Sequence, residues 1–205
     1  MSRVVFIALA ALLISGAARA EDEPRTVDPA ASAAFDKKLF AAPMDADMTY
    51  ACFRRRYDAA HLAQHARQKV SAMKLLVIAR KPSAENREAY SFKLGFNYRG
   101  RKGNWDTSGY CKHAQNEITD GELRMSCGVE CDGGHISVGL PKDGDGAMVR
   151  LERIQVWQNS KPDEEKREAL VAGSDDGMFR LQRTALKECE SLVEDREERL
   201  AMRQK

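Results

Sequence analysis

Residues 90–98, YSFKLGFNY, are the stretch that decides the fold of this chain. Apolar side chains, most of them aromatic, occupy every second position from Tyr90 to Tyr98, and small or polar side chains lie between them. Successive side chains of a β-strand point to opposite faces, so this period of two predicts a strand with one apolar and one solvated face. A single strand cannot bury that apolar face, and the pattern therefore also predicts a sheet.

Further strands are predicted on both sides of this stretch. Short apolar or alternating runs recur at 74–80, 125–129, 136–140, 148–157, 170–172 and 179–181. Within 148–157 the apolar set moves from Val149 and Leu151 to Ile154 and Val156, and this change of phase predicts a β-bulge. Turn residues at 143–146 and 174–177 predict hairpins.

The spacing of the strands favours one class of fold. The connections are too short for the crossover helices that a parallel sheet requires. We therefore expect a mainly β protein, an antiparallel barrel or sandwich with short helices at the N- and C-terminal ends. An α+β fold is the alternative.

Helices are predicted only outside the strand-rich region. Asp28 followed by Pro29 is typical of a helix start, and this helix is expected to continue to Leu39. A second helix is predicted over 49–67, because aromatic and histidine side chains recur there every four residues. These residues are Phe53, Tyr57, His61 and His65. The charged tail 185–203 is predicted to be a third helix.

The first twenty residues have the order of a secretory signal peptide. Arg3 precedes an apolar run that ends at Ile14, and a small-x-small cleavage site closes at Ala20. The run is too short for a membrane span, and no second apolar stretch follows. We expect a periplasmic or secreted protein with a signal peptide over 1–20, a flexible leader with a short helix over 21–48, and one β-rich domain with a C-terminal helix over 49–205.

The charge balance argues against nucleic acid as a partner. Cleavage after Ala20 removes Arg3 and Arg19, so the 33 Lys and Arg of the whole chain fall to 31, which equals the 31 Asp and Glu. A neutral protein has no overall field that attracts a polyanion. The basic clusters at 54–56 and 99–102 are typical of solvated faces or turn ends.

Five cysteines follow the expected cleavage site. They are Cys52, Cys111, Cys127, Cys131 and Cys189. In an oxidising compartment they are expected to form disulfides and leave one thiol over. If residues 119–121 close a hairpin, Cys111 lies opposite Cys127, although a bulge would bring Cys131 there instead. Cys52 and Cys189 would then tie the N-terminal helix to the C-terminal one.

A metal site is the alternative use of these side chains. Two groups of possible metal ligands stand close in sequence, one of cysteines and histidines and one of two histidines. Their sulfur and nitrogen atoms suit zinc or copper. One group is Cys111, His113, Cys127, Cys131 and His135, and the other is the pair His61 and His65. Neither spacing matches a common zinc motif. Disulfides compete for the sulfurs, and packing against the sheet competes for the helical pair.

Residues 130–135, ECDGGH, form the candidate binding loop. Glu130, Asp132 and His135 could converge there on a ligand. The two glycines favour a tight turn as the simpler explanation. Asp143 and Asp145 begin like a calcium loop, but Ala147 and Ile154 replace the later ligands of an EF-hand, so a turn is expected.

No local catalytic motif is present. The sequence lacks the nucleophile elbow of α/β-hydrolases, a phosphate-binding loop, the HExxH zinc motif and CxxC. Carboxylate-pair hydrolases leave no local motif, so a hydrolase remains one alternative and a periplasmic metal-binding protein another. The step 108–110, Ser-Gly-Tyr beside Cys111, is similar to the Ser-Gly loops of periplasmic lysozyme inhibitors, and we carry no function over from it. The preferred hypothesis is an exported, non-catalytic domain that binds a protein or a cell-envelope component, without a cofactor.

Overall fold

The computed structural model of the chain describes residues 27–81, 89–115, 120–129, 132–143, 145–158 and 168–204. The expected signal peptide over 1–20 and two residues of special interest, Glu130 and Cys131, lie outside these ranges. Within them, none of the helices is long and apolar enough to cross a membrane.

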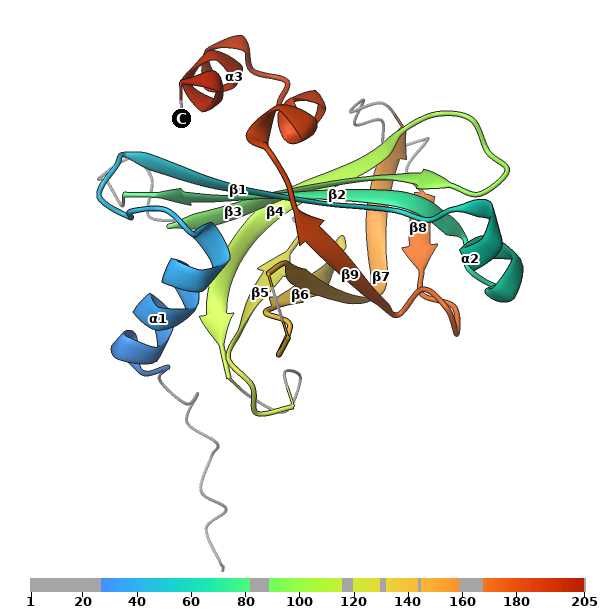
Figure 1. Cartoon of the computed structure of the whole chain (residues 1–205), viewed down its shortest axis with the longest axis horizontal. Helices are drawn as coiled ribbons and strands as arrows, with labels where there is room; N and C mark the ends of the chain where they lie inside the picture. Colours follow the sequence, from blue (N-terminus) through green and yellow to red (C-terminus); the bar gives the residue numbers. More distant parts are fainter. Residues whose placement is uncertain are drawn as a thin grey trace, which may run out of the picture.

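Nine antiparallel strands form one sheet that closes in a ring (Figure 1). The strands are β1 (Met48–Arg56), β2 (Val70–Arg80), β3 (Tyr90–Tyr98), β4 (Trp105–Ala114), β5 (Arg124–Gly128), β6 (Gly134–Gly139), β7 (Ala147–Gln158), β8 (Glu168–Val171) and β9 (Met178–Arg183). Each strand from β1 to β7 pairs with the next, and β9 joins β7 to β1. The predicted mainly β class is confirmed, and of the two expected forms the ring of strands is the barrel.

Strands β8 and β9 share one edge of β7 and run in the same direction. Residues 168–171 pair with 153–156 of β7, and residues 178–181 pair with 147–150. The hairpin predicted at 174–177 is therefore wrong. The turn is a break between two strands that follow each other along the same side of β7, because the chain resumes pairing with β7 after it. The bulge predicted in β7 is confirmed, since Glu152 and Arg153 together lie opposite His135.

The inside of the ring is filled by side chains. Phe92, Leu94 and Phe96 of β3 project inward with every second residue of the other strands and are buried. The helix α1 (Pro29–Phe40) adds Phe35, Leu39 and Phe40 to the same core. Its predicted start is confirmed, because the Asp28 carboxylate accepts a hydrogen bond from the Ala30 backbone N–H at 3.0 Å.

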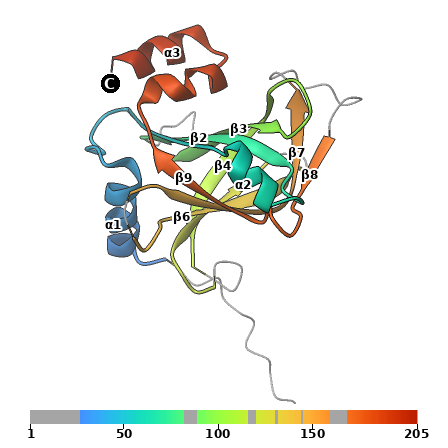
Figure 2. The ribbon, with the colours of Figure 1, turned by 45° about the vertical axis from the view of Figure 1, so that its right-hand side comes forward.

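A second, smaller core lies outside the ring, beneath the C-terminal helices. The 3₁₀ helix η3 (Leu186–Leu192) and the helix α3 (Arg196–Arg203) cover the outer face of β1 and β2 (Figure 2). The single helix predicted for this tail is wrong. Val193 interrupts it, because its side chain is buried against the sheet and Asp195 starts a new helix by accepting the Glu198 N–H.

The helix predicted over 49–67 is also wrong. Most of that stretch is β1, and only α2 (Ala59–Gln64) is helical. Residues 49–53 are all buried, because Ala51 and Phe53 face the inner core while Tyr50 and Cys52 face the outer one. A strand buried on both faces loses the period of two, and the spacing of four that remained was mistaken for a helix.

Two disulfides join parts of this fold. Cys111 and Cys127 lie opposite each other on β4 and β5, with Cα atoms 4.0 Å apart, which confirms the predicted pair. Cys52 and Cys189 are also bonded, with Cα atoms 6.0 Å apart. The second pair joins a strand to η3, whereas two helices were expected.

Candidate functional site

The pairing between the first and last strands of the ring is short. Strand β1 pairs with β9 only at Phe53 with Arg183 and at Arg54 with Gln182, and the Thr184 N–H donates to the Cys52 carbonyl at 2.9 Å. The next rung would join Arg56 to Arg180, and no such pair is found among the described residues. Beyond Arg54 the two strands are no longer hydrogen-bonded to each other. We call this part of the wall the seam.

Two adjacent carboxylates hold the wall together beside the seam. Asp176 is fully buried and accepts hydrogen bonds from the backbone N–H groups of Lys69, at 2.7 Å, and Val70, at 3.2 Å. Asp175 accepts from the Arg67 N–H at 3.2 Å. The loop between β8 and β9 is thereby fastened to the start of β2. Side-chain oxygens take the place that a neighbouring strand has elsewhere in the ring.

A column of stacked side chains stands on the other side of the seam. The Arg55 guanidinium lies 5.2 Å from the Tyr57 ring centre, Tyr57 stacks on His61 at 4.5 Å, and His61 stacks on His65 at 4.2 Å. His61 Nε2 lies 2.9 Å from Gln68 Oε1, and the Gln68 amide donates to the Val70 carbonyl. Because the Gln68 oxygen can only accept, the His61 Nε2–H is the donor of this hydrogen bond.

Burial changes the acidity of the tyrosine in this column. It raises the pKa of Tyr57, and the nearby Arg55 lowers it by less.

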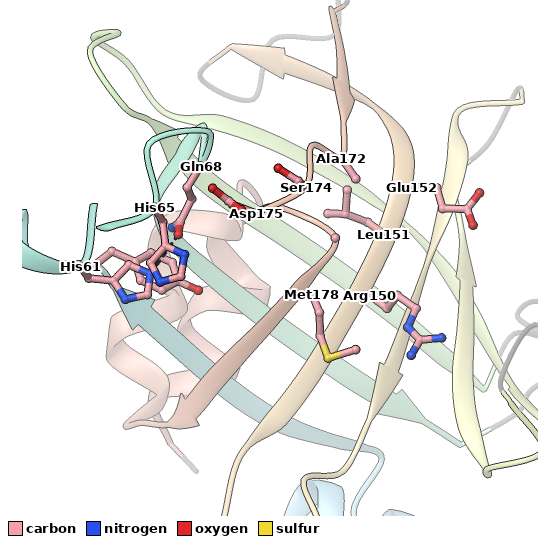
Figure 3. Close-up of a pocket in the computed structure, with 12 residues that line it drawn as sticks. His61, His65, Gln68, Arg150, Leu151, Glu152, Ala172, Ser174, Asp175 and Met178 are labelled. Carbon is pink, nitrogen blue, oxygen red and sulfur yellow. Dashed lines mark hydrogen bonds between the residues drawn. The ribbon is translucent and has the colours of Figure 1, made fainter. Parts of the chain in front are cut away.

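An open cleft of about 620 Å³ lies between this column and the strands β7 and β9 (Figure 3). Its floor is apolar, with Leu151, Ala172 and Met178, and its rim is polar. In Figure 3 the two histidines and Gln68 stand on one side, Ser174 and Asp175 on the second, and Arg150 and Glu152 on the third. A concave surface with an apolar floor and a few polar groups is typical of binding sites.

In the described part of the chain, which leaves out Cys131, the predicted metal ligands are not arranged to share a metal ion. The sulfurs of Cys111 and Cys127 are bonded to each other and are not thiolates. His61 and His65 are stacked with 25° between their planes, so their lone pairs, which lie in the ring planes, do not converge on one ion. Among the described residues no three His, Cys, Asp or Glu side chains form a group that could hold a metal.

The predicted binding loop is built as a turn where it is described. Asp132 is exposed with φ 57°, and Gly134 has φ 84°. A Cβ on Gly134 would lie 2.1 Å from the Arg153 carbonyl oxygen, so the glycine is needed for the close approach of β7. His135 is half-buried in β6, where it lies opposite Gly128 of β5. The segment 108–110 is no loop either, because it is the middle of β4.

A buried polar cluster holds α1 against the barrel on a different side. Asp36 of α1 receives a hydrogen bond from the Tyr90 hydroxyl at 2.6 Å and lies 2.9 Å from His113 Nε2. Burial and the bond to Asp36 raise the pKa of Tyr90 far above its usual range. Of the predicted metal ligands, His113 therefore has a different partner, and both carboxylate oxygens of Asp36 are engaged in docking the helix.

Comparison with known proteins adds nothing to this geometry. The chain matches no protein-family model, and no curated protein and no solved structure is significantly similar to it.

Sequence reasoning located part of the cleft and missed the rest. The spacing of four singled out Tyr57, His61 and His65, which do stack, but it placed all three in one helix over 49–67, whereas α2 covers only 59–64. Asp175 and Asp176 were identified only as turn residues. Their pairing with 67–70 joins positions more than a hundred residues apart, and no local signal carries that information.

Proposed function

We propose that this protein is an exported, non-catalytic domain that binds another component of the cell envelope through the cleft beside the seam. Export is supported by the signal-like residues 1–20 and by two disulfides, which are typical of oxidising compartments such as the periplasm. Neither nucleic acid nor a cofactor is part of the proposal.

One observation carries the choice of site. The inside of the ring is packed with apolar side chains, as small barrels often are, so a ligand has to bind on the outside, and the cleft beside the seam offers a concave surface there with an apolar floor and a polar rim. Its volume of about 620 Å³ is within the usual range of ligand sites, roughly 300 to 1,000 Å³.

Site-specific photo-crosslinking in the cells that make the protein tests this proposal. A photoreactive residue is placed at Met178, in the cleft, or at Leu200, on α3 away from it; both side chains are 47% exposed in the unmodified protein. We expect a defined adduct from position 178 and none from position 200. The same adducts from both positions, or none from either, would overturn the proposal.

A further inference from the structure

The edge of β9 at the seam carries backbone groups that have no strand beside them. In an antiparallel ladder the N–H and C=O of successive residues point alternately to the two neighbours. The Thr184 N–H points to β1, and the Gly177 carbonyl accepts from the Leu151 N–H of β7. By this alternation, the N–H and C=O of Met178 and Arg180 point toward the seam.

These groups have no backbone partner among the described residues. Pairing between β1 and β9 stops at Arg54 with Gln182, although β1 itself continues to Arg56. The other edge of β9 is fully used, since Ala147 to Arg150 of β7 pair with Leu181 to Met178. An unpaired edge of this kind is a template for one more strand.

We propose that the seam binds an extended polypeptide segment of a partner protein, which pairs with Met178–Arg180 as an added strand. This inference rests on the proposed function and names its partner class. Main-chain pairing provides the affinity in such complexes, and pockets for alternate side chains provide the selectivity. Here the floor formed by Leu151, Ala172 and Met178 suits apolar side chains at alternate positions of the segment.

The features around the edge favour a peptide over other occupants. The unpaired groups are main-chain donors and acceptors in strand spacing, which only another extended backbone matches rung by rung. The arginines of β9 are also already neutralised, because Arg180 pairs with Asp143 and Arg183 with Asp145. An anionic polymer would therefore gain little charge attraction at this edge.

Amide hydrogen exchange measured by nuclear magnetic resonance tests the edge in the free protein. The amide protons of Met178 and Arg180 are expected to exchange fast, while those of Phe179 and Leu181, which point to β7, are protected. Protection of all four amides in the free protein would overturn the inference, because the edge would then already be paired.

Selection from a library of random peptides displayed on phage tests the occupant. Met178→Pro removes the N–H that points to the seam, and Met178→Val keeps it, so the first variant is used for counter-selection and the second is the matched control. Thermal melts establish that both variants fold. Selected peptides are expected to bind the Pro variant at least about tenfold more weakly than the Val variant, the change for about 1.4 kcal/mol.

The outcomes separate this inference from the proposed function. Peptides that protect the Met178 and Arg180 amides on binding support strand addition. If no peptide distinguishes the two variants, strand addition is wrong, and a position-specific adduct from Met178 in the crosslinking experiment would still support binding at the cleft. Self-association of the protein through this edge, detected by sedimentation, would replace the partner segment with a second copy and overturn the inference as stated.

Discussion

The two edges of β1 close the ring in different ways. Along one edge nine residues, from Met48 to Arg56, pair with β2 without interruption. Along the other, two residues pair with β9, and the carboxylates of Asp175 and Asp176 and the column from Arg55 to His65 hold the surrounding wall. The comparison teaches that the ring closes with a continuous ladder on one side of its first strand and a short one on the other. Where side chains hold the wall, main-chain groups of β9 have no strand beside them among the described residues. We propose that the protein binds its partner there.

The largest loss of stability is expected when the disulfide on β1 is removed. Cys52 precedes the seam by two residues and ties β1 to η3 across a separation of 137 residues. In the chain-entropy model, replacing Cys52 and Cys189 with alanine lowers the free energy of unfolding by about 5 kcal/mol. Denaturant titration measures the loss.

The matched control is the double alanine variant of Cys111 and Cys127, whose separation is 16 residues. It is expected to lose about 3 kcal/mol. An equal or larger loss of unfolding free energy in the control would show that loop length does not set the size of the loss. It would also show that the disulfide of Cys52 has no special role beside the seam.

Asp176→Ala tests whether a carboxylate replaces the missing strand. The change leaves the N–H groups of Lys69 and Val70 without their acceptor in a buried place, and we expect a loss of about 3 kcal/mol in unfolding free energy. Asp175→Ala, which removes one longer bond near the surface, should cost about 1 kcal/mol. Similar small losses in both variants would mean that the wall does not depend on Asp176.

The pH dependence of stability tests the contact that docks α1 on the barrel, and a tyrosine beside the seam serves for comparison. The pKa of Tyr90 is raised above the ordinary value of 10.0 that it has in the unfolded chain. Above pH 10 the unfolded chain therefore releases a proton that the folded protein keeps, and stability falls by up to about 1.4 kcal/mol per pH unit.

Tyr90→Phe removes this contribution, so its unfolding free energy should fall less steeply than that of the unmodified protein between pH 10 and 11. Tyr57→Phe at the seam is the comparison, because the pKa of Tyr57 is raised as well. Equal slopes for Tyr90→Phe and the unmodified protein would show that folding does not raise the pKa of Tyr90. The contact between Asp36 and Tyr90 would then not be the anchor of α1.

The smallest expected effect belongs to the histidine stack. A double-mutant cycle with His61→Ala and His65→Ala should give a coupling energy of about 0.5 to 1 kcal/mol, the usual worth of an aromatic pair. A coupling near zero would show that the column does not stiffen this side of the cleft.

The sequence predicts the ladder far better than it predicts the seam. The alternation in 90–98 correctly located β3, the shift after Leu151 correctly located the bulge, and the hairpin register correctly paired Cys111 with Cys127. All three signals are local. Strand β1 was missed because both its faces are buried, and the role of Asp176 was missed because its partners lie 107 and 106 residues away.

The position of the closing contact also constrains how the protein folds. The ring is completed by Phe53 and Arg183, which stand near opposite ends of the described chain. Contacts between residues so distant in sequence are slow to form, because most of the chain must be ordered or searched before they meet. A polypeptide that crosses a membrane from its N-terminus cannot make this contact until its last strand has emerged. If the chain is exported as we propose, ring closure waits for complete translocation, and β1 needs protection from aggregation during that interval.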